Sequence, residues 1–154
     1  MKRKYFLLVL FFILAIFLSG CSGVTTQSIN LTGNWTMTNI VTSTNNPIHN
    51  IGATTTSKCT IVQDGNSLTI YNFRIIGQEY ISWNTGYGTF NKPIITANIS
   101  GSYLNIYGST VSNIIYFEGN INANGISGSG TWVQTISVSG YTWISSGTSI
   151  FIKG

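Results

Sequence analysis

The sequence predicts an all-β domain, in which about eight to nine antiparallel strands form a meander that closes into an up-and-down barrel. Apolar and polar residues alternate from Leu31 onward, and no later stretch has the spacing of an amphipathic helix. Segments rich in Gly, Asn and Ser separate the alternating runs, as expected for tight turns. Only 6% of the residues are charged. Open sheet edges would therefore be poorly protected, which favours a barrel over the alternative, a two-sheet sandwich.

The first strand shows the alternation well, because Leu31, Trp35 and Met37 share one face and polar residues occupy the other. A loop at residues 45–49 ends this strand. Two glycines interrupt the pattern in a less regular segment at residues 77–92, namely Gly86 and Gly88. The remaining strands are expected at residues 58–63, 68–73, 80–83, 94–100, 103–107, 114–121, 126–134 and 149–153.

Three turn sequences are expected to join neighbouring strands as hairpins. Residues 64–67 have turn composition, and a second turn is predicted at Gly101 and Ser102. The third falls at Asn124 and Gly125, the pair that most favours a type I′ turn because both central residues need positive φ.

The distribution of charge excludes nucleic acid as a partner. The formal net charge is +4, but three of the basic residues lie in the first four positions and are lost if the N-terminus is removed. Four basic and three acidic residues are then left without clustering: Lys58, Arg74, Lys92, Lys153, Asp64, Glu79 and Glu118. Binding to phosphates needs a basic patch, and the mature sequence contains none.

Residues 1–20 have the three-part layout of a signal peptide, with basic residues, an uninterrupted apolar run at 5–18 and then small residues. As a helix in the precursor, this run of about 14 residues would extend roughly 21 Å. A bilayer has a hydrocarbon core of ~30 Å. The length therefore favours a secretion signal over a transmembrane anchor.

Leu18, Ser19, Gly20 and Cys21 resemble the lipobox of bacterial lipoproteins, in which an apolar residue and two small ones precede an obligatory cysteine. The resemblance implies cleavage between Gly20 and Cys21 and attachment of a diacylglycerol to the Cys21 sulfur, which binds the protein to a membrane. It implies a location in the cell envelope, on the outer membrane if the host is Gram-negative. The alternative is an ordinary secretory signal in which Cys21 has no role.

This interpretation divides the chain into three parts. Residues 1–20 are the signal peptide, residues 21–29 are a small, polar and flexible tether that carries the lipid, and residues 30–154 are a single β domain.

Two G-x-W segments occur, one ending at Trp35 and one at Trp132. The first, which opens the first strand, is similar to the G-x-W signature of lipocalins and the wider calycin group. This resemblance implies a lipocalin-like barrel. The alternative interpretation is that glycine lets a strand bend beside a bulky ring, so that both tryptophans plug the barrel.

The residues that could carry chemistry are few and scattered, so we expect no cofactor, no metal site and no enzyme. A paired-carboxylate mechanism would need two of the three acids to converge. His49 is the only histidine, and we expect it to be a solvated loop residue, because a metal site or triad needs further partners. Cys59 is expected to be buried in a strand, with a reactive or intermolecular thiol as the alternative. An enzymatic function would be supported only if Glu79 or Glu118 lay close to His49 in a cleft.

Aromatic residues make up 13% of the chain, and they allow two kinds of role besides core packing. Rings and amides at a barrel mouth could bind a small apolar or sugar-like ligand, or they could anchor a protein partner. The sequence thus predicts a lipid-anchored, non-catalytic envelope protein that binds a small ligand, although no ligand-binding residue is identified. The alternative is a structural or protein-interaction lipoprotein with a filled core.

Overall fold

The computed structural model describes residues 28–154. The predicted signal peptide, the Gly20 and Cys21 cleavage site, the lipid attachment site and most of the tether lie outside the described residues. Within residues 28–154 the regular structure consists of nine strands: β1 (Gly33–Thr44), β2 (Thr54–Asp64), β3 (Ser67–Ile75), β4 (Ser82–Trp83), β5 (Gly86–Asn91), β6 (Ile94–Leu104), β7 (Thr110–Ile121), β8 (Ser127–Val138) and β9 (Tyr141–Lys153).

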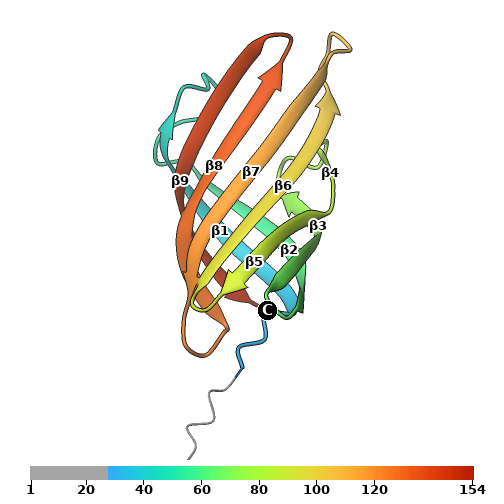
Figure 1. Ribbon diagram of the computed structural model, residues 1–154. Coiled ribbons are helices and arrows are strands. Elements are labelled where there is room, and N and C mark those ends of the chain that lie inside the picture. Colours follow the sequence, from blue (N-terminus) through green and yellow to red (C-terminus); the bar gives the residue numbers. More distant parts are fainter. Residues whose placement is uncertain (1–27) are drawn as a thin grey trace, which may run out of the picture.

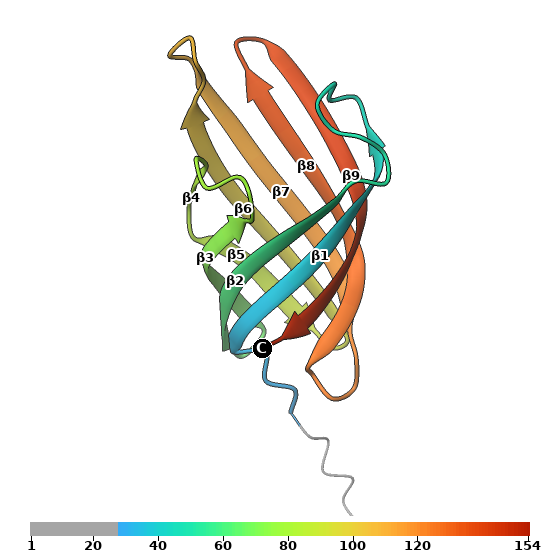
Figure 2. The same ribbon diagram turned by 180° about the vertical axis from the view of Figure 1, so that it is seen from behind.

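Eight of these strands form a closed antiparallel ring in the order β1-β2-β3-β5-β6-β7-β8-β9, in which β9 returns to pair with β1 (Figures 1 and 2). Apart from β4, each strand pairs with its neighbours in sequence. The short β4 is an extra strand that pairs with β6 through Trp83 and Gly101. The predicted up-and-down barrel is therefore confirmed, and the alternative sandwich was wrong.

The turn predicted at Gly101 and Ser102 was wrong, because β6 runs through both residues and the chain reverses at residues 105–109. Gly101 lies on the inner face, where the Trp83 ring covers it so closely that a β-carbon would lie 2.7 Å from Trp83 Cε3. The glycine there serves close packing and not chain reversal. In the same way Gly86 and Gly88 do not interrupt the sheet but form part of β5.

The type I′ turn predicted at Asn124 and Gly125 was also wrong. The connection between β7 and β8 spans residues 122–126, and only Gly125 has positive φ. Backbone hydrogen bonds from the Asn122 N–H to the Ser127 carbonyl at 2.9 Å and from the Gly125 N–H to the Asn122 carbonyl at 3.0 Å close this connection, and Asn122 Oδ1 also accepts the Ser127 N–H at 3.3 Å. The two-residue turn with positive φ at both positions occurs instead between β8 and β9, at residues 139–140.

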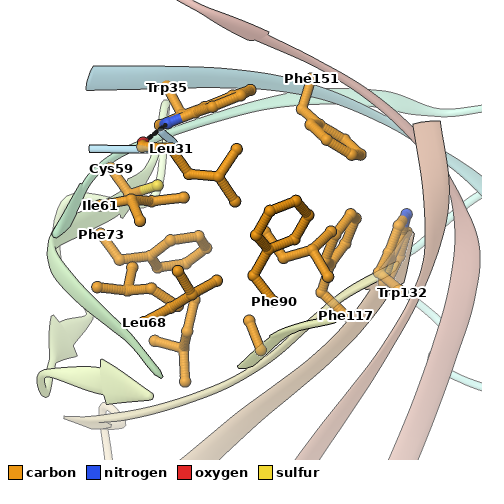
Figure 3. Packing of buried hydrophobic residues seen from close by; sticks show 14 of the residues in the cluster. Leu31, Trp35, Cys59, Ile61, Leu68, Phe73, Phe90, Phe117, Trp132 and Phe151 are labelled. Atoms are coloured by element: carbon orange, nitrogen blue, oxygen red, sulfur yellow. Dashed lines mark hydrogen bonds between the residues drawn. The ribbon is translucent and has the colours of Figure 1, made fainter. Parts of the chain in front are cut away.

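The two ends of the barrel differ in what covers them. At the closed end, where β2 joins β3 and β7 joins β8, the segment before β1 lies below the strand ends (Figure 1). Leu31 of this segment is fully buried, and its carbonyl oxygen accepts a hydrogen bond from Trp35 Nε1 at 2.8 Å (Figure 3). Its N–H donates to Gln63 Oε1 on β2, also at 2.8 Å. Trp35 therefore plugs this end, as one interpretation of its G-x-W segment predicted.

Two further contacts fasten the closed end. The Lys153 ammonium at the end of β9 donates to the carbonyl oxygen of Asn30 at 2.9 Å. Ile29 lies against Gly125, where a β-carbon would be 2.7 Å from Ile29 Cγ2. The folded structure thus includes Ile29, one residue before the start expected for the domain.

Glycines on the inner faces of β7 and β8 make room for aromatic rings. Gly119 and Gly130 face each other across the two strands, and a β-carbon on either would lie 2.9 Å from the ring of Phe117. A β-carbon on Gly128 would lie 2.5 Å from the ring of Phe151. The rings of Phe117 and Phe151 meet edge to face with centroids 5.1 Å apart, and they fill the part of the barrel next to the closed end (Figure 3).

The contact between β3 and β5 is the shortest in the ring. Residues 67–70 of β3 pair with residues 86–89 of β5. Beyond that point β3 bends, with Asn72 at a φ of 52° and a register shift opposite Lys58 to Thr60. The next strand along the chain, β4, pairs with β6 and not with β3.

Candidate functional site: the barrel interior

A narrow cavity of about 70 Å³ lies inside the barrel. Most of its lining side chains are buried, but those of Met37, Asn39, Thr55 and Ile115 are partly exposed although they point inward, so their exposed surface faces the cavity and its mouth. The lining is predominantly apolar and comes from all ring strands except β5: Trp35, Met37, Asn39, Thr55, Ser57, Cys59, Ile61, Ile70, Phe73, Ile75, Ile95, Ala97, Ile99, Ile115, Phe117, Trp132, Gln134 and Phe151.

The floor of the cavity is aromatic. Trp35 and Phe151 lie with ring centroids 5.9 Å apart, and Phe151 in turn contacts Phe117. Trp132, which the sequence suggested as a second plug, forms part of the side wall (Figure 3), and its Nε1 donates to the carbonyl oxygen of Thr148 at 3.2 Å. The floor is therefore sealed toward the closed end, and any ligand must enter from the other direction or through the wall.

Two groups of polar side chains lie between this apolar floor and the open end, where β1 joins β2, β6 joins β7 and β8 joins β9. On one side Asn39 Nδ2 donates to Ser57 Oγ at 2.9 Å, and Ser149 Oγ donates to Asn39 Oδ1. On the other side Gln134 Nε2 donates to Asn113 Oδ1 at 3.1 Å. The cavity thus combines an apolar lower part with amides and hydroxyls above.

The interior of the described barrel carries no charged side chain. The basic and acidic residues lie on outer strand faces, in turns or at strand ends: Lys58, Asp64, Arg74, Glu79, Lys92, Glu118 and Lys153. Cys59 is buried as expected, and desolvation raises the pKa of its thiol to about 12, so the group is neutral at physiological pH. A charged ligand would find no counter-ion here.

His49 is not the solvated loop residue that the sequence predicted. The loop at residues 45–53 folds back over the open end, and His49 is partly buried there with Nδ1 2.8 Å from Ser145 Oγ. Ser145 Oγ also lies 2.7 Å from Thr44 Oγ1. Desolvation lowers the pKa of His49, so the imidazole is mainly neutral at pH 7. It acts as a polar link between the loop and β9.

The structure does not bring the acids together with this histidine. Glu79 is exposed in the loop before β4, where Oε1 accepts the Gly77 N–H at 3.0 Å, and this hydrogen bond lowers the pKa of the carboxyl group. Glu118 lies on the outer face of β7 and accepts a hydrogen bond from the Tyr116 hydroxyl at 3.1 Å. Among residues 28–154 no group of three or more His, Cys, Asp or Glu side chains could hold a metal ion.

The aromatic residues lie in the core, at the open end and, for Tyr71, Tyr87 and Tyr116, on the outer wall. Trp35 and Trp132 line the cavity, whereas none of the described tyrosines does. Tyr80 and Tyr103 meet edge to face at 5.0 Å near the open end, and Tyr141 stacks on a tryptophan of β9 in the same region. A mouth with aromatic side chains therefore exists, but it is separated from the aromatic floor by the polar groups.

A second hollow, of about 490 Å³, lies outside the barrel at the closed end. It runs between the segment before β1, the β2–β3 turn and Lys92, and most of the residues that line it are exposed and polar. A binding site for a small molecule normally buries most of the ligand surface. The barrel interior meets that condition better.

Sequence reasoning missed the polar residues of the interior. Asn113 and Gln134 occupy inward positions of the period-two pattern, alternating with Ile115 and Trp132. The signal that could have identified them is this interruption of an apolar face by amides. The pattern within each strand does not show that the strand register makes these amides diagonal neighbours, close enough to form a hydrogen bond.

Within residues 28–154 no helix has the length and apolar character needed to cross a membrane. Comparison with protein-family models, with curated proteins and with solved structures found no match for this chain.

Proposed function

We propose that this protein is a lipid-anchored component of the cell envelope whose barrel binds a small, neutral and mainly apolar molecule without catalysis. The observation that supports binding is the uncharged cavity, with an aromatic floor and amides and hydroxyls toward the open end. Apolar walls with a few oriented polar groups are typical of sites for small molecules. Of the two ligand classes suggested by the sequence, this lining favours an apolar ligand over a sugar.

The size of the cavity limits the ligand. Its volume of about 70 Å³ is about half that of the ~150 Å³ apolar cavity that accommodates benzene in another protein. A slender alkyl or small ring system fits the lower part, and the remainder of the ligand would extend past the polar side chains toward the mouth. Met37, at the partly exposed side of the lining, has the flexible side chain that lets a site adapt to such a shape.

The proposed anchor rests on the lipobox-like residues Leu18 to Cys21. Residue 28 lies at the closed end of the barrel (Figure 2), so the proposed tether would join the barrel at this end. The test is metabolic labelling with palmitate. Labelling of the native protein and its loss in Cys21→Ser are expected, and equal labelling of both proteins would contradict the anchor.

Binding is tested by native mass spectrometry of protein purified from its host. We expect a bound species of constant mass that is released on unfolding. Consistent absence of such a species, together with no retention of small apolar probes by the purified protein, would contradict ligand binding.

A second candidate function, attachment of an envelope protein, is supported by the apolar rim of the open end. Six large side chains in the loops and at the strand ends there are at least 69% exposed: Ile48, Ile51, Leu104, Ile106, Tyr107 and Tyr141. Exposed apolar side chains gathered at one end are typical of interaction sites. A photocrosslinker at Ile106 in intact cells should give one discrete product if this role is correct, whereas a crosslinker at Thr131 on the outer wall should give none.

A further inference from the structure

Two unpartnered hydrogen-bond donors flank one glycine in the upper part of the barrel. Gly101 of β6 pairs with Trp83 of β4 on one side and with Asn113 of β7 on the other. All three are neighbours across the sheet, and the Trp83 ring leans over the inner face of Gly101, 2.7 Å from the position that a β-carbon would take. The indole thus occupies the room that a side chain at position 101 would take, and the Asn113 amide belongs to the strand on the other side of the glycine.

Both donors are buried. Asn113 is 1% exposed, and neither its Nδ2 nor the Nε1 of Trp83 has a hydrogen-bond partner among residues 28–154. Burial of a donor without an acceptor is unfavourable, and such groups are rare in folded proteins. Two of them beside the same glycine indicate a place that an acceptor oxygen can occupy.

This place adjoins the cavity described above. The Trp83 ring meets Phe73 edge to face with centroids 4.8 Å apart, and the Asn113 amide is hydrogen-bonded to Gln134. Phe73 and Gln134 both line the cavity. A ligand in the cavity therefore lies one side chain away from either donor, at the end of the cavity that points toward the mouth.

We propose that the Nε1–H of Trp83 and the Nδ2–H of Asn113 bind an acceptor oxygen, such as a carbonyl or ether oxygen, of a neutral ligand whose apolar part lies in the cavity. The proposal rests on the proposed binding function and names the ligand class and the residues that select it. A neutral oxygen is required, because no cation in the described interior could compensate a buried carboxylate. A pure hydrocarbon would leave both donors without a partner.

The experiment compares three probes of equal chain length, which are 2-octanone, octane and octanoate. Binding of each is measured by calorimetry and NMR on the native protein and on the variants Trp83→Phe and Asn113→Leu. Trp83→Phe retains a ring over Gly101 and removes the N–H. Asn113→Leu removes the amide at similar volume. We expect each variant to bind 2-octanone roughly three- to tenfold more weakly, as for loss of one hydrogen bond, and to bind octane with less than a twofold change.

A spectroscopic measurement separates a hydrogen bond from an indirect effect on packing. The carbonyl stretching band of ¹³C-labelled 2-octanone bound to the native protein should lie at lower wavenumber than that of the ketone in an alkane solvent. Part of this shift should disappear in Trp83→Phe. Tyr116→Phe is the matched control, because it removes an aromatic donor on the outer face of β7 that contacts Glu118. The control should leave the affinity and the band unchanged.

The outcomes distinguish the two proposals. If neither 2-octanone nor octane binds, the proposed ligand-binding function fails. If both bind, but the ketone has the same affinity and the same band in the native protein and in Trp83→Phe, ligand binding stands and the donor pair is overturned. Tighter binding of octanoate than of 2-octanone would overturn the preference for a neutral ligand. Circular dichroism checks that each variant is folded. If Asn113→Leu is not folded, the results for Trp83→Phe alone test the donor pair.

Discussion

The closed end and the open end of the same barrel are built in opposite ways. At the closed end Leu31, Trp35 and Phe151 form one continuous apolar core, and inner glycines let the rings and strands approach each other closely. Toward the open end the interior is crossed by hydrogen-bonded amides and hydroxyls, and beyond them Val111 and Ile136 are buried but do not belong to that core. The cavity lies between the two parts.

This difference indicates that stability and binding are assigned to different ends. Dense packing of large rings contributes most of the free energy that a core supplies. Buried amides contribute little net stability even when they are paired, so their presence near the mouth points to recognition. Substitutions should therefore have unequal effects at the two ends.

The largest effect is expected from Trp35→Ala. Removal of this ring leaves a cavity at the closed end and removes the hydrogen bond to Leu31, so the free energy of unfolding should fall by about 3–5 kcal/mol in chemical denaturation. Trp143→Ala at the open end is the control. Trp143 is partly exposed and stacks on Tyr141 with centroids 6.4 Å apart, so its loss should cost about 1 kcal/mol. Equal losses would contradict the division between the ends.

Gly130→Ala should have the next largest effect. The added methyl group would collide with the carbonyl oxygen of Glu118 and would lie 2.6 Å from Gly119 Cα and 2.9 Å from the Phe117 ring. Because most of these atoms belong to the backbone, we expect a loss of about 1–3 kcal/mol in the same measurement. Ser129→Ala, on the exposed outer face of the same strand, should change stability by less than about 0.5 kcal/mol.

The buried thiol of Cys59 should make the free energy of unfolding depend on pH. Burial raises its pKa from 9.0 to about 12, so the folded state favours the neutral thiol. This contribution is fully present below pH 9 and is lost as the pH rises toward 12, at about 1.4 kcal/mol per pH unit. Denaturation curves between pH 8 and 11 should show a steeper loss of stability in the native protein than in Cys59→Ala. Identical slopes would show that the thiol is not buried.

The smallest effect is expected from replacing the amide pair of the open end as a whole. The double variant Asn113→Leu with Gln134→Met removes both partners at similar volume, so no donor or acceptor of the pair is left alone. Its free energy of unfolding should lie within about 1 kcal/mol of that of the native protein, while binding of 2-octanone should weaken. A loss as large as that of Trp35→Ala would assign these amides to stability.

The barrel could be predicted because alternation and turns are local signals. Leu31, Trp35 and Met37 alternate with polar residues, and that pattern is enough to define an inner face. Gly101 could not be interpreted from local signals alone, because glycine occurs both in turns and at sites of close packing. Only the position of Trp83 across the sheet shows that this glycine serves close packing.

The candidate site could be predicted far less well, because it depends on strand register. His49 and Ser145 are 96 residues apart in the chain, and Asn113 and Gln134 are 21 apart. No pattern within one strand specifies which residue of the next strand lies beside it. The sequence therefore suggested only a ligand site at the barrel mouth, whereas the cavity and its polar residues were identified from the structure.

The short pairing of β3 with β5 has a consequence for how the molecule opens. Every strand of the ring has a hydrogen-bonded neighbour on both sides, so separation has to begin within the wall, and the four-residue contact at 67–70 offers the least resistance. The amide hydrogens of Gly88 and Phe90, which face β3, should exchange with deuterated solvent sooner than those in the long β8–β9 hairpin. Transient parting of this junction would give an apolar molecule a sideways route into the interior.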